Sequence, residues 1–533
     1  MQSNQIPFSE TGYFSKFICD YISQSIDTKR LYGNFYDRKG FENQIEKREA
    51  QFSEANRKVL VASLEKQYNN IQASELTTTH IQSLLNSKTF TVTTGHQLNL
   101  FTGPLYFLYK IVSTINLTRD LNERYPEYNF VPVYWMATED HDFEEINHFF
   151  VKNKKVTWDV ACSGPVGRHS TKEMDTVFDQ FSDAVGNNAN ANYLKTLFKK
   201  AYIEHSNLSD ATRYLVNELF GGNGLVIIDG DDKELKREFA PYAQKELQEQ
   251  YAHKAIEGTN KFLEAHYKVQ VNPREINLFY IKDTLRERIV YEDANFKVKN
   301  TDIVFSKNEI IQELELNPEC FSPNVIMRPL YQEVILPNLC YIGGGGELAY
   351  WLQLKEMFTE SDVLFPILLL RNSVALISKK QKEKLARLKI SNGDLFLNQE
   401  ELVAKKIKEA SKLPLDFSHQ KEMLQKIFQE LEAVVEQTDK SFEGALAAQT
   451  KKQTKGIANL EQRLLKAEKR KHADLNLRIR NLQDVLFPRK GLQERNVNFA
   501  EFYAEYGNTL IPTLLENLNP LDQQFTMLCM EQN

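Results

Sequence analysis

Short apolar runs alternate with helix-like stretches from about residue 88 to residue 375. After the first run, apolar residues recur mostly every three or four positions between Leu105 and Leu117, which is the spacing of a helix. Near-continuous apolar runs separated by helices are typical of strands buried on both faces of a parallel sheet. The chain therefore predicts an α/β fold with a Rossmann-like core, whose expected strands are FTVTTG (90–95), FVPVYWMA (130–137), GLVIID (224–229), NVIMRPLYQEVILP (324–337) and VLFPILLLRN (363–372).

Four other segments have a different composition. Residues 149–175 and 268–306 alternate with period two and contain turn residues, which predicts small β-rich insertions on the crossovers. Residues 376–483 are rich in Lys, Glu, Gln and Leu, with apolar steps of three and four that predict an antiparallel helical hairpin or coiled coil. This arm has 23 Lys and Arg against 15 Asp and Glu, which fits either a solvated helix face or contact with phosphate or nucleic acid. The aromatic stretch 486–511 is too apolar for a free tail and should fold back.

Composition narrows the class of protein. A chain of 533 residues is too long for one compact core, and its net charge of −6 argues against a dedicated nucleic-acid binder. The N-terminal MQSNQIPFSE lacks the pattern of a signal peptide, and no apolar run approaches the ~20 residues that span a bilayer. We expect a soluble cytoplasmic protein without a membrane partner, whose scattered cysteines are reduced thiols: Cys19, Cys162, Cys320, Cys340 and Cys529.

Two polar turns should meet at one edge of the sheet. TTGHQ (93–97) follows the first expected strand and EDHD (139–142) follows the second. Ligands of open α/β sheets bind beyond the carboxyl ends of the strands, and adjacent ionisable groups are costly unless paired, hydrated or bound to a ligand. Asp140 or Asp142 could instead cap the next helix. The candidate residues are Gly95, His96, Gln97, Glu139, Asp140, His141 and Asp142.

A third turn, in YIGGGGELAYWLQLKEMF (341–358), places four glycines between an apolar run and a helix expected near Glu347. Glycine allows close approach of a ligand, and a helix N-terminus offers free N–H groups, although glycine runs are also plain loops. Gly344, Gly345, Glu347 and Tyr350 are the candidates here. Three such turns predict a site for a phosphorylated or carboxylated small molecule, with His96, Asp140, His141 and Asp142 as its ionisable core. No quartet with zinc-type spacing appears, so we expect no metal site.

Two arginines and the C-terminal tail leave alternatives open. Arg328 and Arg371 lie within or just after expected strands, where each needs a partner that is either a substrate carboxylate or an internal Asp or Glu. In the tail, GLQER (491–495) and YGN (506–508) could hold a nucleotide base or merely dock the tail on the body. The residues concerned are Gln493, Arg495, Tyr506 and Gly507.

Four stretches, TTGHQLNLFTGPLYFLYKIVS, VPVYWMATEDHDFEEINH, GGGGELAYWLQLK and LQERNVNFAEFYAEYG, together resemble the bacillithiol biosynthesis cysteine-adding enzymes, the BshC family of cysteine ligases. The resemblance implies a nucleotidylyltransferase-type Rossmann core with two connecting-peptide insertions and a C-terminal coiled coil that forms a homodimer. The implied parts are a helical region and first half of the core (1–148), the first insertion (149–215), core (216–267), the second insertion (268–322), the second half of the core (323–375), the coiled coil (376–483) and a segment packed back on the core (484–533).

The resemblance also implies the last step of bacillithiol synthesis, in which cysteine is joined to the amino group of glucosaminyl malate. A free carboxylate must be activated for this, so ATP or ADP with Mg²⁺ is the implied cofactor and cysteinyl adenylate the expected intermediate. More distantly, the layout resembles class I cysteinyl-tRNA synthetases and mycothiol ligase, although a second histidine after Gly95-His96 and a KMSKS loop are absent. The implied roles are phosphate or charge contacts for Gly95, His96 and Gln97, amine binding for Asp140 or Asp142, general base for His141 and malate binding for Arg328.

Two other functions fit the same residues. A nucleotidylyltransferase acting on another small molecule would use the same three turns. A coiled-coil scaffold or RNA-binding protein would use the basic arm and leave the turns idle, and a steeply salt-dependent RNA affinity would favour it.

Overall fold

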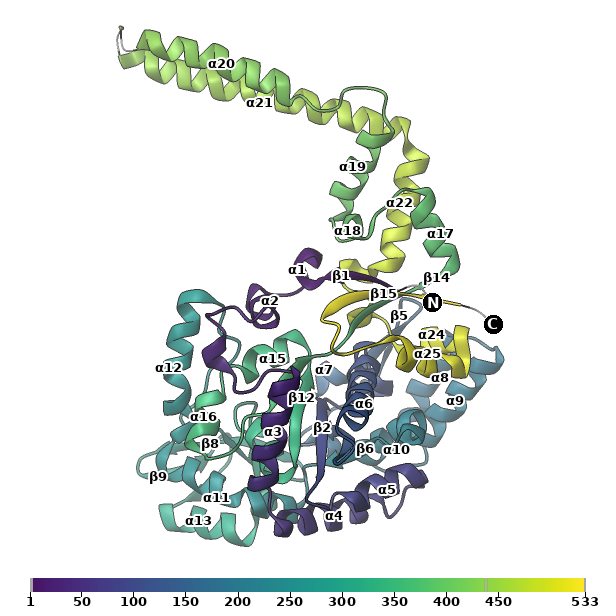
Figure 1. Ribbon diagram of the computed structural model, residues 1–533, viewed down its shortest axis with the longest axis vertical. Helices are drawn as coiled ribbons and strands as arrows, with labels where there is room; N and C mark the ends of the chain where they lie inside the picture. The colour runs from purple at the N-terminus through teal and green to yellow at the C-terminus, as the bar shows by residue number, and fades with distance from the viewer. Residues whose placement is uncertain (1–2, 436, 439, 532–533) are drawn as a thin grey trace. The chain divides into compact units, whose positions relative to one another are not determined.

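The computed structural model describes residues 3–435, 437–438 and 440–531. The chain forms two compact units. The first runs from the N-terminal region to Leu376 and resumes at Leu492–Leu528, and the second consists of Ile377–Gly491 with Cys529–Glu531 (Figure 1).

The first unit is built on a five-stranded sheet in the order β13-β12-β2-β3-β6, in which every neighbouring pair is parallel. Its strands are almost wholly buried, and the predicted Rossmann-like parallel core is confirmed. The strands are β2 (Thr89–His96), β3 (Asn129–Met136), β6 (Val226–Asp229), β12 (Asn338–Gly343) and β13 (Ile367–Leu370).

One predicted strand was wrong. Residues 324–337 contain the helix α14 (Arg328–Ile335), and the strand is the next segment, β12. The Asn324 side chain accepts hydrogen bonds from the Ile326 and Met327 N–H groups, and Pro329 occupies the first turn, where a missing N–H costs nothing. The run is apolar because both a buried helix and a buried strand require apolar residues.

Helices cover this sheet. The helix predicted after the first turn is α6 (Tyr106–Arg124), which packs on β2 and β3. The side chains of Phe41 and Ile45 in α3 share a core cluster with those of β2, β12 and β13. The other helices before β2 and after β6 are α1 (Phe8–Thr11), α2 (Lys16–Ile22), α3 (Arg38–Gln51), α4 (Glu54–Tyr68), α5 (Glu75–Ser83), α11 (Lys233–Glu249), α12 (Tyr251–His266), α15 (Gly345–Trp351) and α16 (Lys355–Glu360).

Two insertions interrupt the core. The first contains α7 (Phe143–Ile146), the hairpin of β4 (His148–Val151) and β5 (Lys154–Thr157), and the helices α8 (Met174–Val185), α9 (Ala189–Tyr202) and α10 (Leu208–Phe220). The second is a five-stranded sheet in the order β10-β9-β8-β7-β11, followed along the chain by α14. Its elements are β7 (Leu278–Lys282), β8 (Leu285–Glu292), β9 (Asn295–Val298), β10 (Val304–Phe305), α13 (Lys307–Leu316) and β11 (Phe321–Pro323).

The predicted return of the C-terminal tail to the body is confirmed. The Asn498 amide donates to the carbonyls of Phe101 and Gly103, which lie in the turn after β2. Phe101 has a φ of 47°, a conformation that needs such support in a non-glycine residue. At the outer edge, β1 (Ser3–Pro7) pairs antiparallel with β15 (Gln524–Met530). The tail helices are α23 (Gln493–Asn496), α24 (Phe499–Tyr506) and α25 (Leu510–Asn517).

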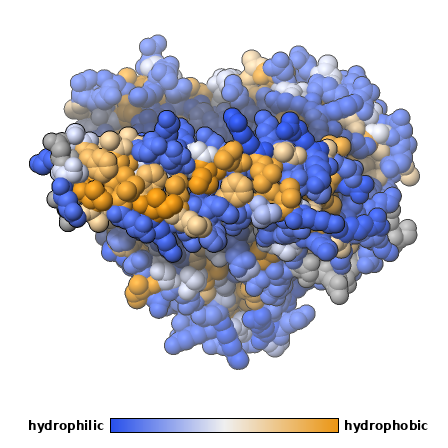
Figure 2. Space-filling model, turned by 90° about the horizontal axis from the view of Figure 1, so that it is seen from above, coloured by the Kyte–Doolittle hydropathy of each residue, from blue (hydrophilic) through white to orange (hydrophobic). Residues whose placement is uncertain are grey.

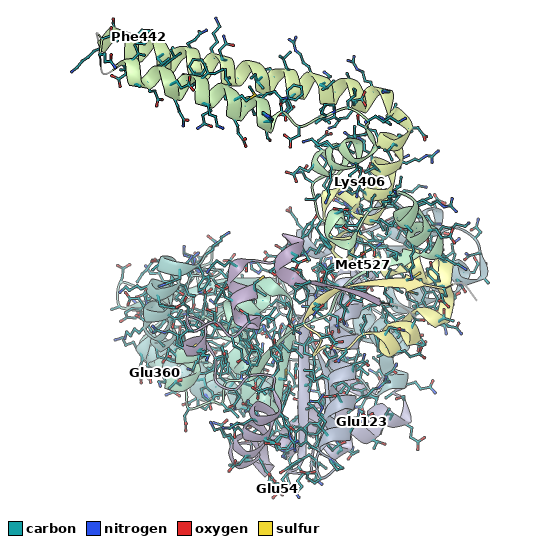
Figure 3. All side chains as sticks on the ribbon, turned by 45° about the horizontal axis from the view of Figure 1, so that its top comes forward. Glu54, Glu123, Glu360, Lys406, Phe442 and Met527 are labelled. Atoms are coloured by element: carbon teal, nitrogen blue, oxygen red, sulfur yellow. The ribbon has the colours of Figure 1, made fainter. Side chains whose placement is uncertain are left out.

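The second unit is helical and contains the predicted antiparallel hairpin. Its long arms are α20 (Ser418–Val435) and α21 (Lys440–Lys471), with Phe442 beside the tip (Figure 3). Lys421 and Glu461 join the arms by an ion pair of 2.5 Å. The remaining elements of the second unit and its boundary are β14 (Ser373–Ser378), α17 (Lys379–Arg387), α18 (Asn392–Leu395), α19 (Gln399–Ala410) and α22 (Ala473–Leu486).

Part of the predicted hairpin seam faces outward. Phe428 and Leu446 are buried between the arms, whereas Ile427 and Leu431 are 52% and 38% exposed. Met423, Val434 and Leu460 of the same two helices are also exposed, and Figure 2 shows an apolar stripe on the face seen from above. No helix in the described ranges combines the length and the apolar character needed to cross a bilayer.

Candidate active site

A cavity of about 950 Å³ opens at the carboxyl ends of β2, β3 and β12. The three predicted turns form its floor, and the β7–β8 hairpin of the second insertion adds a further wall. The turns therefore meet as the sequence predicted. The predicted residues that line the cavity are Gly95, His96, Gln97, Glu139, Asp140, His141, Asp142, Arg328, Gly344, Gly345, Glu347, Tyr350, Arg371 and Arg495.

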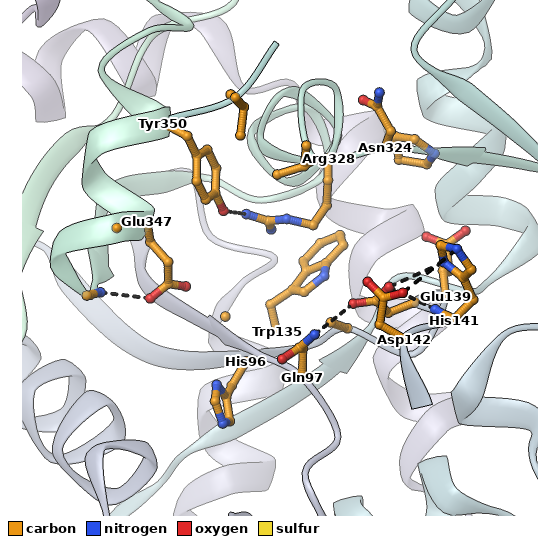
Figure 4. A pocket seen from close by; sticks show the side chains of 18 of the residues that line it. His96, Gln97, Trp135, Glu139, His141, Asp142, Asn324, Arg328, Glu347 and Tyr350 are labelled. Carbon is orange, nitrogen blue, oxygen red and sulfur yellow. Dashed lines mark hydrogen bonds and ion pairs between the residues drawn. The ribbon is translucent and has the colours of Figure 1, made fainter. Parts of the chain in front are cut away.

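The turn after β2 contributes a neutral histidine. His96, labelled in Figure 4, is 8% exposed. Its ring packs against the rings of Tyr106 and Phe107. Burial, together with the positive charges of Lys110 and Arg371, lowers its pKa well below the ordinary value. Its Nε2 atom is buried without a hydrogen-bond partner in the described structure. The His96 ring can therefore form a hydrogen bond with a ligand, but it does not supply a positive charge.

The turn after β3 is bonded directly to the turn after β2. Asp140 accepts hydrogen bonds from Gln97 Nε2 at 3.1 Å and from the His141 backbone N–H at 2.8 Å. Burial raises the pKa of Asp140, but bonds from His141 and Gln97 and the charge of Arg286 outweigh it and lower the pKa below its ordinary value. Asp140 is thus an ionised carboxylate. Asp142 precedes α7 but makes no side-chain cap, so the helix-capping alternative does not hold.

His141 is held by an arginine that the sequence did not single out. Arg286 Nη1 lies 2.6 Å from His141 Nδ1, and the guanidinium stacks 4.0 Å from the Phe279 ring centre. A guanidinium only donates, so Nδ1 must accept and the imidazole proton is on Nε2. Nε2 faces Asp142 at 4.0 Å.

Glu139 holds the turn after β3 in place through a buried ion pair. Its carboxylate lies 2.7 Å from Lys236 Nζ, which also binds Asp231 at 3.0 Å. Arg168 of the first insertion contacts both Asp231 and Asp283 of the β7–β8 hairpin. Burial raises the pKa of Glu139, and the charge of Lys236 partly offsets this. The buried network connects the acidic turn with both insertions.

The glycine turn is bonded to the carboxylate of Glu347, which lies in the helix that follows it. Glu347 Oε2 accepts the Gly344 N–H at 2.7 Å, and Glu347 Oε1 accepts from Lys110 at 2.8 Å and from the Tyr341 hydroxyl at 3.0 Å. The Gly344 N–H, one of the N–H groups at the start of this helix, is therefore bonded within the protein. Lys110 also donates to the Gly95 carbonyl at 2.6 Å, so it joins the first and third turns.

The two arginines differ in their partners. Arg371 forms a bidentate ion pair with Glu494 at 2.8 and 3.1 Å, which is the internal-partner alternative. Arg328 lies among aromatic rings and bonds only to Gln332 at 3.1 Å and to the Tyr350 hydroxyl at 3.4 Å (Figure 4). Within the described ranges no carboxylate lies within ion-pair distance of Arg328. Arg328 is therefore a half-buried cation that is open to an anionic ligand.

The four tail residues do not form one cradle. Of these four residues, Arg495 alone lines the cavity. The Gln493 side-chain amide is bonded instead to the backbone of Leu376, through both its oxygen and its nitrogen. Tyr506 is buried, and Gly507 has a φ of 62° and lies close to Asn190.

Sequence reasoning missed several residues of the cavity. Lys110 interrupts the apolar first turns of α6, and Arg286 and Arg288 alternate within LRERIVYE, so both signals were present in the sequence. Trp135 ends β3 and gave no signal, since an aromatic residue at a strand end is most often core. Across the described part of the chain, no three His, Cys, Asp or Glu side chains are grouped to hold a metal ion.

Comparison with known proteins gives one consistent result. Residues 1–372 match the family described as bacillithiol biosynthesis BshC, N-terminal Rossmann-like domain, and residues 374–530 match its C-terminal coiled-coil domain. Relatives named "Putative cysteine ligase BshC" include those of Flavobacterium johnsoniae and Flavobacterium psychrophilum, each 54% identical over 99% of this chain and 100% and 99% of their own. The relative of Cytophaga hutchinsonii is 38% identical over 99% of both chains.

Proposed function

This chain belongs to the BshC family of bacillithiol biosynthesis, and from that premise we propose that it is a ligase joining the carboxyl group of L-cysteine to the amino group of glucosaminyl malate. The observation that carries the proposal is one cavity with two kinds of charge. Asp140 is an ionised acceptor for a substrate ammonium group, and Arg328 is a cation without a carboxylate partner in the described structure. Both substrates carry an amine and carboxylates, so both charges have a use.

The residues of the cavity divide the chemistry. An amine attacks only as a free base, so a proton must leave it. Asp140 and Asp142 hold the ammonium form of the amine. The atom that would accept its proton is His141 Nδ1, which accepts a hydrogen bond from Arg286 in this structure. Negative charge develops on the carbonyl oxygen during attack, and donors aimed at it speed the reaction. Arg328 and neutral His96 are the available donors.

Activation of the cysteine carboxylate needs an energy source, for which we propose ATP with Mg²⁺. When bound, this nucleotide supplies the leaving group that makes the carboxylate reactive. The residues that fit its phosphates are Arg328 and Arg495, both of which line the cavity. Magnesium usually keeps several waters and binds to phosphates and one or two carboxylates, which is compatible with Asp140 and Asp142 without a protein-only metal cluster.

We further propose that the protein is a homodimer through the α20–α21 hairpin. The exposed apolar stripe of Ile427, Leu431 and Val434 supports this, because long apolar surfaces on a protruding helix pair usually meet a partner. A nucleic-acid partner has less support, since the first unit contains the charged cavity and the chain as a whole is acidic.

The first experiment is an end-point assay by mass spectrometry with purified protein, cysteine and glucosaminyl malate, with and without ATP and Mg²⁺. Bacillithiol that forms only with ATP would support the whole proposal and make AMP or ADP the next product to identify. Bacillithiol without ATP would keep the ligase and refute the energy source. If Asp140→Asn protein forms as much bacillithiol as the wild type, the product does not arise in this cavity.

A further inference from the structure

Two arginines of the second insertion face the cavity side by side. Arg286 and Arg288 lie two residues apart on β8, and side chains two apart project from the same face of a strand. Both line the cavity, together with Arg274 at its exposed rim. The apolar part of this wall comes from Ile276 and Phe279.

Neither arginine is hydrogen-bonded to a carboxylate in the described part of the chain, although Arg286 lies within ion-pair distance of Asp140. The Arg286 side chain is 8% exposed, its Nε is buried without a hydrogen-bond partner, and its nearest carboxylate oxygen, on Asp140, is 3.9 Å away. Its one short contact is to the neutral His141 ring. The Arg288 Nε is likewise buried and unpartnered, and in the described ranges no carboxylate lies within 4.0 Å of its guanidinium. A buried guanidinium is stable only with an anion or several acceptors. Arg286 has the Asp140 carboxylate at 3.9 Å and the half-buried Arg288 has no carboxylate in reach, so the two cations leave room for a further anion.

We propose that Arg286 and Arg288 form a subsite for a dicarboxylate, which in the reaction proposed above is the malate end of the amine substrate. This inference rests on that proposed function for the identity of the ligand. Each guanidinium presents a planar fork that matches one carboxylate, so two forks on one strand face match two. The wall is a β-surface with apolar neighbours and has no glycine-rich turn, which favours compact carboxylates over a polyphosphate chain.

The test is direct binding of L-malate to the full-length protein by isothermal titration calorimetry. Arg288→Gln and Arg286→Lys should each weaken malate binding by about ten- to a hundredfold, the usual effect of losing or weakening a charge-assisted hydrogen bond. Lys282→Gln is the matched control, because it removes a positive charge from the same hairpin outside the cavity and should leave binding unchanged. Pyrophosphate and ATP are the competing ligands.

Unaltered malate binding in both arginine variants would overturn the proposal, as would undetectable binding of malate to the wild type. Loss of ATP or pyrophosphate binding instead of malate binding would assign the wall to phosphate and refute a dicarboxylate subsite. Steady-state kinetics add a second readout. Arg288→Gln and Arg286→Lys should each raise KM for glucosaminyl malate and leave KM for cysteine unchanged.

The two proposals fail separately. If the wild type makes bacillithiol but the arginine variants bind malate and react normally, the proposed ligase activity is supported and the proposed dicarboxylate subsite is refuted. If no bacillithiol forms but malate binding depends on Arg286 and Arg288, the dicarboxylate subsite is supported and the protein catalyses a reaction other than the proposed ligation.

Discussion

Asp140 shows how one side chain joins two turns that lie 43 residues apart in the chain. Its carboxylate is ionised by its surroundings and faces the cavity, so we expect Asp140→Asn to lower kcat at least about a hundredfold, as removal of a positioned acid–base group does. Asparagine keeps the shape and one acceptor oxygen, so the thermal unfolding temperature should stay within a few degrees. Bacillithiol formation by mass spectrometry and circular dichroism check the two halves of this prediction.

The control for Asp140→Asn is Asp142→Asn at the other carboxylate of the turn. The Asp142 side chain is 57% exposed and makes no cap, so this variant should lose less activity. Equal losses in both variants would mean that the turn needs only its total negative charge.

His96 makes stability depend on pH. Its pKa is lowered by burial in the folded protein, while in the unfolded chain it is about 6.5. A group whose pKa is lowered on folding stabilises the folded state above its unfolded pKa, and that stability is lost as the pH falls. We expect each pH unit below about 6.5 to remove up to about 1.4 kcal/mol from the free energy of unfolding.

Urea unfolding of the wild type and of His96→Asn at pH 7.5 and pH 5.5 measures this contribution. The fall in stability between the two pH values should be smaller in the variant, because the other histidines are unchanged. Equal falls would show that His96 takes up its proton inside the folded protein.

At the level of residues, the sequence could place side chains that follow strands but not their partners. Asp140, His141 and Gln97 could be predicted together because each follows a strand of one sheet. The partners of Arg328 and Arg371 could not be predicted, because Glu494, the partner of Arg371, lies 123 residues after it in the chain. Local pattern carries no information on such a pair.

At the level of elements, the α20–α21 hairpin presents apolar side chains that its own packing does not use. Ile427→Lys with Leu431→Lys should convert the proposed dimer to a monomer, because a lysine pair in an apolar contact cannot be desolvated without cost. Analytical ultracentrifugation measures the mass. Leu477→Lys is the control, since Leu477 is 58% exposed but lies in α22. A monomeric wild type would refute the dimer outright.

The elements also show where periodicity fails as a predictor. The strands β2, β3, β6 and β13 were recognisable as apolar runs between helices. The run at 324–337 was not distinguishable from them by hydrophobicity, although Pro329 was a helix-start signal within it. In the hairpin, Ile427 follows the same spacing as buried positions, yet it faces outward because two helices bury only one side of each.

At the level of the whole first unit, the Arg371–Glu494 ion pair fastens the returning C-terminal segment to the end of β13. Glu494 also accepts bonds from Ser373 Oγ and the Val374 N–H. Arg371→Met leaves this carboxylate buried without its cation, and we expect a loss of about 3–5 kcal/mol in the free energy of unfolding. The double variant Arg371→Met with Glu494→Leu removes both charges and should lose less.

Urea unfolding of the single and double variants tests this order. The exposed pair Lys58–Glu54 is the control, since Lys58→Met should leave stability unchanged (Glu54 is labelled in Figure 3). A double variant that is less stable than the single one would mean that Glu494 acts mainly through Ser373 and Val374.

The pairing of β1 with β15 has a consequence for how the protein is made. Residues 3–7 leave the ribosome long before their partners at 524–528, which are more than five hundred residues behind them. At about 5–20 residues per second, the first strand waits roughly half a minute to two minutes for the last. During that time its backbone is an open edge that other chains could join. The N-terminal strand is therefore open to pairing with other chains until residues 524–528 have been made.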